Sequence, residues 1–184
     1  MNKKEDIFYN LLKISRPYQW VKNTLVFLPM IMSHNLNLEK LTNSFIGFNV
    51  FSIIASSIYI INDIADKEAD KKHPFKKKRP LAAGLIKIDH CLYLVFSLLI
   101  ISGILLIYTN KYFIILIFIY FIISNTYTFF LKKLIIIDLI TLSFLYTLRI
   151  IGGGLIADIS ISIWLISFSV FFFIALASVK RLIE

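Results

Sequence analysis

The sequence predicts an all-α integral membrane protein, and three observations lead to this fold class. Hydrophobic residues make up 58% of the 184 residues and charged residues 17%, whereas a soluble domain carries about 45–50% and about 25%. Apolar stretches recur at close to the length of about 20 residues that a membrane-spanning helix needs. Lys and Arg are concentrated in alternate loops. These properties exclude a soluble globular domain, a disordered chain and a disulfide scaffold, since Cys91 is the single cysteine.

The first element, residues 1–17, is predicted to be a short helix that lies on the membrane surface. Its apolar residues recur at helical spacing and fall on one face, as in interfacial amphipathic helices. They are Ile7, Phe8, Leu11, Leu12 and Ile14.

Six spanning helices are predicted after this segment. The first, residues 18–33, contains Lys22 and Pro29, and the fifth, residues 134–157, contains Asp138 and Arg149. The other four carry no Asp, Glu, Lys or Arg and cover residues 41–61, 90–110, 112–131 and 159–179. The expected fold is therefore a transmembrane bundle in one domain, 1–184, with residues 62–89 as its longest loop.

The distribution of positive charge predicts the orientation of the bundle. Of the 20 Lys and Arg residues, 17 lie in four segments on one side of the predicted membrane: residues 1–22, 67–87, 132–133 and 180–181. Lys40 and Lys111 lie on the other side. Loops rich in Lys and Arg stay in the cytoplasm. The N-terminus and the 62–89 loop are thus expected at the cytoplasmic face of the cell membrane.

An acidic motif follows the second predicted span. Asp63, Asp66 and Asp70 fall within about 60° of one another on a helix, with Asn62 beside them and Glu68 pointing away. Carboxylates packed so closely repel one another, and the repulsion is strong next to lipid. A cation relieves it, and an all-oxygen ligand set suits Mg²⁺. The alternative is a solvated helix end whose acids pair with neighbouring lysines.

A basic loop comes directly after the acidic motif. Residues 62–80 contain four acids and seven bases, with Arg79 fixed before Pro80. A magnesium–diphosphate complex requires both: acids for the metal and cations for the remaining phosphate charge. The lysines are equally compatible with a role in topology and contact with anionic lipid. Arg79 is the residue expected to bind phosphate directly.

These motifs resemble those of the UbiA-type intramembrane prenyltransferase superfamily. The pattern Asn-Asp-x-x-Asp-x-x-x-Asp at residues 62–70 resembles its first aspartate-rich motif. Residues 16–23 and 73–84 narrow the resemblance to the decaprenyl-phosphate phosphoribosyltransferase branch. Further matches extend it over nearly the whole chain: Tyr127, Leu131, Lys132, Asp138, Leu148, Arg149 and Gly152–Gly154.

The resemblance implies a helical bundle of nine spans around a cytoplasmic cavity. It implies transfer of 5-phosphoribosyl from phosphoribosyl diphosphate to a polyprenyl (decaprenyl) phosphate lipid, with Mg²⁺ on Asn62, Asp63, Asp66 and Asp70, and with Asp63 and Asp66 central to catalysis. The expected substrate-binding residues are Lys22, Asn23, Arg79, Tyr127, Lys132, Asp138, Lys180 and Arg181. No nucleic-acid partner is expected.

Asp138 and Arg149 lie within a predicted span, where charged side chains are costly and usually face a cavity or a partner. Their axial separation of about 16 Å is too long for a salt bridge, so each is expected to need another partner. For Arg149 a structural role is as well supported as a functional one. The glycines that follow it are expected to allow close packing or to break the helix.

Six of the nine expected spans are present, and the chain ends at Lys180-Arg181-x-x-Glu184, where the superfamily carries its second polar motif. The sequence is therefore expected to be a truncated form, with activity of these 184 residues in question. Two alternatives remain open. One is an aromatic prenyltransferase that uses the same acids for a prenyl diphosphate. The other is a non-enzymatic transporter or lipid-binding protein.

Overall fold

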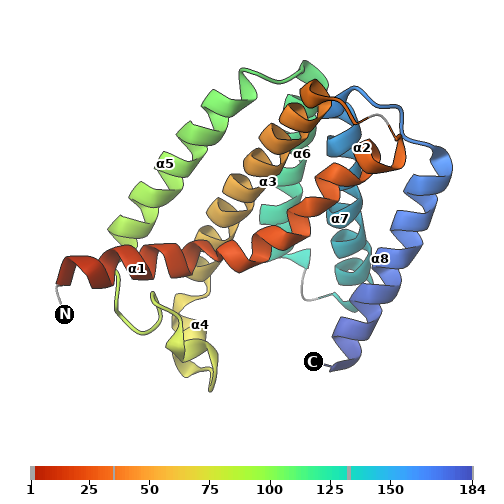
Figure 1. Ribbon diagram of the computed structural model, residues 1–184. Coiled ribbons are helices and arrows are strands. Elements are labelled where there is room, and N and C mark those ends of the chain that lie inside the picture. The colour runs from red at the N-terminus through yellow and green to blue at the C-terminus, as the bar shows by residue number, and fades with distance from the viewer. Residues whose placement is uncertain (1–2, 35, 132–133, 184) are drawn as a thin grey trace. The chain divides into compact units, whose positions relative to one another are not determined.

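The computed structural model describes residues 3–34, 36–131 and 134–183, and all regular secondary structure within these ranges is helical (Figure 1). Of this chain, the side chains of residues 3–6, 135, 180 and 183 are also not described. The helices form two compact units. The first unit comprises residues 1–20 and 52–104, and the second comprises residues 21–51 and 105–184.

Four described helices are long and apolar enough to cross a membrane. They are α3 (Leu38–Ala65), α5 (Ile88–Leu106), α6 (Lys111–Phe129) and α7 (Ile135–Ala157). In α8 (Ile163–Ile183) the apolar part, Ile163–Val179, is shorter. The prediction of a bundle of apolar helices is therefore confirmed, whereas the predicted number of six spans is not.

The first predicted span, residues 18–33, differs from the expected single α-helix. It consists of the 3₁₀ helix η1 (Pro17–Phe27) followed by the short helix α2 (Leu28–Met32), with Pro29 in the first turn of α2. A proline in a first turn loses no intrahelical hydrogen bond. Because a 3₁₀ helix rises about 2.0 Å per residue, η1 and α2 together have a length of about 30 Å, close to the thickness of a hydrocarbon core.

In the first unit, the helix α1 (Lys3–Ser15) packs against a small apolar core. Ile14 is buried there with Ile60 of α3 and with Cys91 and Val95 of α5. Phe8 and Leu12, which the sequence placed on the same apolar face, are exposed. The apolar stripe of α1 is thus wide enough to serve both the core and a lipid surface.

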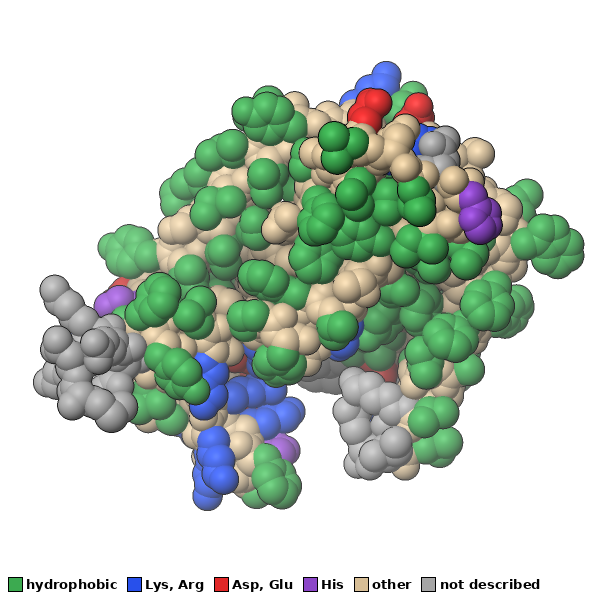
Figure 2. All heavy atoms as spheres, in the orientation of Figure 1, with side chains coloured by type: hydrophobic (Ala, Val, Ile, Leu, Met, Phe, Trp, Pro, Cys, Tyr) green, Lys and Arg blue, Asp and Glu red, His purple; other side chains and the backbone are tan. Residues whose placement is uncertain are grey.

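The predicted 62–89 loop is partly helical. The helix α3 continues through Asn62 and Asp63 to Ala65, and a turn at Asp66 leads into α4 (Lys67–Lys72). A single turn of 3₁₀ helix, η2 (Lys76–Lys78), precedes Arg79. In Figure 2, Lys and Arg side chains gather around α4 and the residues after it, whereas the helix surfaces in the same view are mainly hydrophobic.

In the second unit, α7 packs against α2, α6 and α8. The glycines of α7 permit this close approach. A Cβ atom on Gly153 would lie 2.1 Å from the carbonyl oxygen of Val26, and one on Gly152 would lie 2.7 Å from the ring of Phe51. The helix continues past both residues to Ala157. Of the two roles expected for these glycines, the structure has close packing and no break.

Candidate active site

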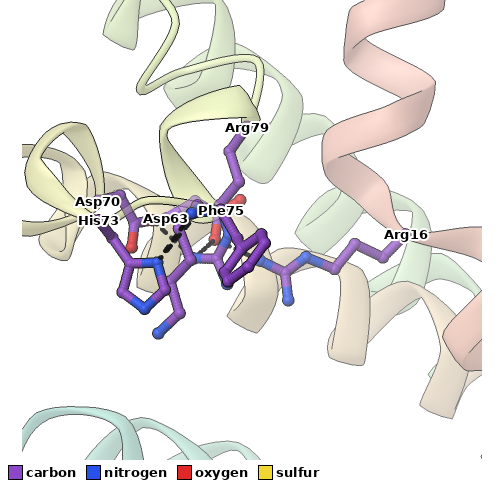
Figure 3. Close-up of polar contacts among 7 residues, drawn as sticks. Arg16, Asp63, Asp70, His73, Phe75 and Arg79 are labelled. Atoms are coloured by element: carbon purple, nitrogen blue, oxygen red, sulfur yellow. Dashed lines mark hydrogen bonds and ion pairs between the residues drawn. The ribbon is translucent and has the colours of Figure 1, made fainter.

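The polar residues of the first unit meet around Asp63, at the end of α3. Its carboxylate is 3% exposed, and its Oδ1 atom accepts hydrogen bonds from Arg16 Nη2 at 2.5 Å and from Arg79 Nη1 at 3.1 Å. Arg79 Nη1 also donates to Asp70 Oδ2 at 2.6 Å. Figure 3 shows the two guanidinium groups reaching Asp63 from different segments of the chain. Two buried carboxylates are thereby neutralised by two arginines.

Arg16 reaches this position because one face of α3 holds the turn that carries it. Ser56 donates to the carbonyl oxygen of Ser15 at 2.8 Å and accepts from the indole nitrogen of Trp20 at 2.9 Å. The guanidinium of Arg16 lies over the ring of Tyr59, 5.1 Å from its centroid. Ser56, Tyr59 and Asp63 follow the i, i+3, i+7 spacing of a single helical face.

Arg79 is positioned by the turns of the basic loop. The ring Nδ1 atom of His73 accepts hydrogen bonds from the backbone nitrogens of Phe75 and Lys76 at 3.2 and 3.3 Å. The backbone nitrogen of Arg79 donates to the carbonyl of Lys76, and Leu81, two residues later, is buried in the apolar core. The backbone on either side of Arg79 is therefore fixed, while its side chain is 25% exposed.

The other residues of the predicted acidic motif do not all lie on one continuous helix, and they differ in how deeply they are buried. Asp70 is 3% exposed, whereas Asp66, at the turn between α3 and α4, and Asn62 are half-buried. Glu68 is exposed and bonded to Lys71 at 2.7 Å. This hydrogen bond lowers the pKa of Glu68, and the charges of Lys71, Lys67 and Lys72 add to the effect. Glu68 thus points away from Asp63, as the helical spacing predicted.

The second unit has a polar cluster of its own around Arg149, which is 6% exposed. Its guanidinium donates to Asn23 Oδ1 at 2.8 Å, to the Tyr120 hydroxyl at 2.8 Å and to the Leu145 carbonyl at 2.6 Å. It also lies 5.1 Å from the ring centroids of Tyr120 and Tyr146. The buried charge is fully surrounded by acceptors and aromatic rings, which explains how it is accommodated inside an apolar helix.

A smaller cluster in the second unit contains three predicted substrate-binding residues. The Tyr127 hydroxyl donates to Asp138 Oδ1 at 2.7 Å, and Arg181 Nη1 lies 3.8 Å from Asp138 Oδ2. Asp138 thus has the partner that a charged side chain within an apolar helix was expected to need. Lys22 lies 6.0 Å from the ring centroid of Tyr146. Lys132 and the side chain of Lys180 lie outside the described residues.

Comparison with known proteins identifies the family. Residues 24–183 match the model of the UbiA prenyltransferase family. The chain belongs to this family. A UbiA homolog from Archaeoglobus fulgidus, solved with DMAPP and Mg²⁺, has the same fold, with a TM-score of 0.74 over 90% of this chain and 60% of that chain, at 19% identity.

Two relatives illustrate the range of proteins that this chain resembles. It is 32% identical to the decaprenyl-phosphate phosphoribosyltransferase of Mycolicibacterium smegmatis, over 98% of this chain and 58% of that protein. It is 36% identical to the protein y4nM of Sinorhizobium fredii, over 92% of this chain and 33% of that protein. The UbiA chain described here thus spans less than two thirds of the length of either relative.

The carboxylates of this UbiA chain are suited to a divalent cation, both because their ligand atoms are oxygens and because two of them point at one position. Among the described residues no three His, Cys, Asp or Glu side chains already form a metal-binding group. Asp63 and Asp70 nevertheless direct one oxygen each at a single atom, Arg79 Nη1, which carries part of a positive charge. Two carboxylate oxygens that share one cationic centre are a partial ligand set of the type that Mg²⁺ prefers.

Arg16 and Tyr120 are the residues that the sequence analysis did not assign to a site. A signal for Arg16 was available, because the polar face of Asp63 continues back along α3 through Tyr59 and Ser56. No equivalent signal marked Tyr120, since its partner Arg149 lies 29 residues away in the sequence.

Proposed function

We propose that this protein transfers the 5-phosphoribosyl group of phosphoribosyl diphosphate to a polyprenyl phosphate, at the cytoplasmic face of the cell membrane. The observation that carries the proposal is the buried pair Asp63 and Asp70, neutralised by Arg16 and Arg79 beside a strongly basic loop. Such a site supplies both signs of charge to a diphosphate and its counterion. The 32% identity to a protein named decaprenyl-phosphate phosphoribosyltransferase supports the choice of donor and acceptor.

In the proposed reaction, the bond between the anomeric carbon and the diphosphate oxygen breaks, and a bond to an acceptor phosphate oxygen forms. Asp63, Asp66 and Asp70, with Asn62, would hold Mg²⁺, which when bound withdraws negative charge from the diphosphate. Arg79 and the neighbouring lysines bind the phosphate oxygens that remain charged. Because the acceptor phosphate is already an anion, the chain needs no residue to remove a proton from it.

The test is a transfer assay in membranes that contain the 184-residue chain. Phosphoribosyl diphosphate labelled in the ribose is supplied with decaprenyl phosphate, and lipid-bound label is measured with Mg²⁺ and with excess EDTA. The proposal predicts labelled lipid that depends on both the acceptor and the metal. In parallel, a labelled prenyl diphosphate is supplied with 4-hydroxybenzoate. Prenyl transfer without any phosphoribosyl transfer would replace the proposed reaction with aromatic prenylation.

A further inference from the structure

The two arginines that bond Asp63 are held in different ways. Both donate to the same oxygen, Oδ1, but Arg79 also donates to Asp70 and so lies between the two carboxylates. Two guanidinium groups therefore share one carboxylate oxygen, and one of them also serves the second carboxylate. The difference in how they are anchored indicates different roles.

Arg16 is fixed to the helix that carries Asp63. Its backbone has a φ of 50°, a left-handed conformation that a non-glycine residue adopts only where its surroundings enforce it. Pro17 follows it, and Ser15 and Trp20 on either side are both bonded to Ser56. Its side chain is 16% exposed and rests on the ring of Tyr59. Every one of these contacts keeps the guanidinium against Asp63.

The side chain of Arg79, in contrast, is held at the site by the ion pairs of its guanidinium with Asp63 and Asp70. The backbone of Arg79 belongs to the basic loop, its side chain is 25% exposed, and its guanidinium contacts Asp63 and Asp70. Release of these contacts frees the side chain without displacing α3. The point that its Nη1 atom occupies is the point at which both carboxylates converge.

We propose that Arg16 is a positioning residue that stays bonded to Asp63 throughout turnover, whereas Arg79 fills the cation position between Asp63 and Asp70 and gives it up to the divalent metal. This inference rests on one part of the proposed function, the binding of a divalent metal by Asp63 and Asp70. It does not depend on which donor substrate the protein uses. Together with Arg16, Arg79 balances the charge of the two buried carboxylates before the metal arrives. Once displaced, it carries its charge to the phosphate side of the site.

The exchange predicts that loss of Arg79 tightens metal binding by more than the loss of another positive charge from the same loop does. Binding of Mn²⁺ alone is measured by electron paramagnetic resonance on the purified chain in detergent, without donor or acceptor. Arg79→Gln is expected to lower the Kd for Mn²⁺ by about tenfold, which corresponds to about 1.4 kcal/mol. Arg79→Lys, which refills the position with a cation, restores a Kd close to that of the unchanged protein.

Arg16→Lys keeps the charge but loses the planar group that both bonds Asp63 and stacks on Tyr59. It is expected to raise the Kd for Mn²⁺ at least threefold, although Lys at position 79 has little effect. A merely structural role for Arg16 would leave the Kd of the folded fraction unchanged. The thermal midpoint Tm without metal identifies any variant that fails to fold.

Lys77→Gln is the matched control, because it removes one positive charge from an exposed position in the same basic loop. Its effect on the Kd measures the change in general electrostatic attraction. An Arg79→Gln Kd no lower than that of Lys77→Gln would overturn the exchange, as would the absence of Mn²⁺ binding in all variants. If the Kd values follow the predicted order while no phosphoribosyl transfer occurs, the exchange stands and the proposed donor is wrong.

Discussion

Asp63 shows how a buried carboxylate is accommodated at the end of an apolar helix. It accepts hydrogen bonds from two arginines, and removal of one partner from such a buried group typically costs about 3–5 kcal/mol. In the proposed reaction, the carboxylate oxygens that bond the arginines also bind the metal. The contribution of Asp63 to activity can be tested separately from that of other acids nearby.

Asp63→Asn is expected to abolish phosphoribosyl transfer, because an amide keeps the size of the side chain but loses the charge that a divalent cation requires. Product formation in membranes is measured per amount of protein. Glu68→Gln is the control: Glu68 is exposed and bonded to Lys71, and activity should stay within about twofold. An equal loss in both variants would contradict the assignment of separate faces.

Arg79→Ala is expected to raise the KM for phosphoribosyl diphosphate by at least about tenfold, since a charge-assisted contact with phosphate contributes about 1.5–3 kcal/mol. Initial rates are measured over a range of donor concentrations. Lys77→Ala, in the same loop, should change the KM less. A tenfold effect from both would mean that general attraction, not the Arg79 contact, governs binding of the donor.

Arg149 is expected to stabilise the folded second unit. Arg149→Met removes the charged donor of the hydrogen bonds to Asn23 Oδ1 and to the Tyr120 hydroxyl, and each hydrogen bond to a charged group contributes about 1.5–3 kcal/mol. The folded fraction and the Tm in detergent are therefore expected to fall. Tyr120→Phe, which removes a single hydroxyl, should lower the Tm less. A folded Arg149→Met protein with an unchanged Tm would show that the cluster is not structural.

At the scale of elements, the glycines of α7 set how closely the helix approaches its neighbours. Gly153→Ala places a methyl group 2.1 Å from a backbone oxygen, which no side-chain rotation can relieve. The expected destabilisation is about 1–3 kcal/mol, measured by thermal unfolding in detergent. Gly103→Ala in α5 is the matched control, because a Cβ there meets open space and improves helix propensity. Equal effects would contradict the packing role.

Sequence reasoning predicted the elements better than their junctions. The apolar helices follow from composition and length, and helical spacing predicted that Asp63 and Asp70 share one face. The ion pairs of Arg79 with both carboxylates were not predicted, since Arg79 was expected to bind phosphate. The turn at Asp66 and the 3₁₀ segment at residues 17–27 were not predicted, since hydropathy patterns resolve neither. Pairings between distant segments, such as Arg149 with Tyr120, depend on tertiary packing and leave little trace in local sequence.

At the scale of the whole molecule, the positive-inside pattern predicts which ends of the helices face the cytoplasm. Single cysteines at position 37 and position 77 report on the two faces, and the natural Cys91 is fully buried, which limits background labelling. In intact cells, a membrane-impermeant maleimide should label Asn37→Cys and not Lys77→Cys. Labelling of Lys77→Cys from outside would reverse the predicted topology and with it the cytoplasmic location of the proposed site.

The hydrogen bond between Asn23 and Arg149 joins residues that are 126 positions apart. During synthesis, the segment around Asn23 therefore leaves the ribosome long before Arg149 does. The hydrogen bond between these two residues can form only after Arg149 has been added. The contacts of α6 with α7 and of α7 with α8, in contrast, join consecutive helices and can form as the chain emerges. Insertion of α7 is consequently the step that brings Arg149 to Asn23, and the packing of α8 on α7 follows it.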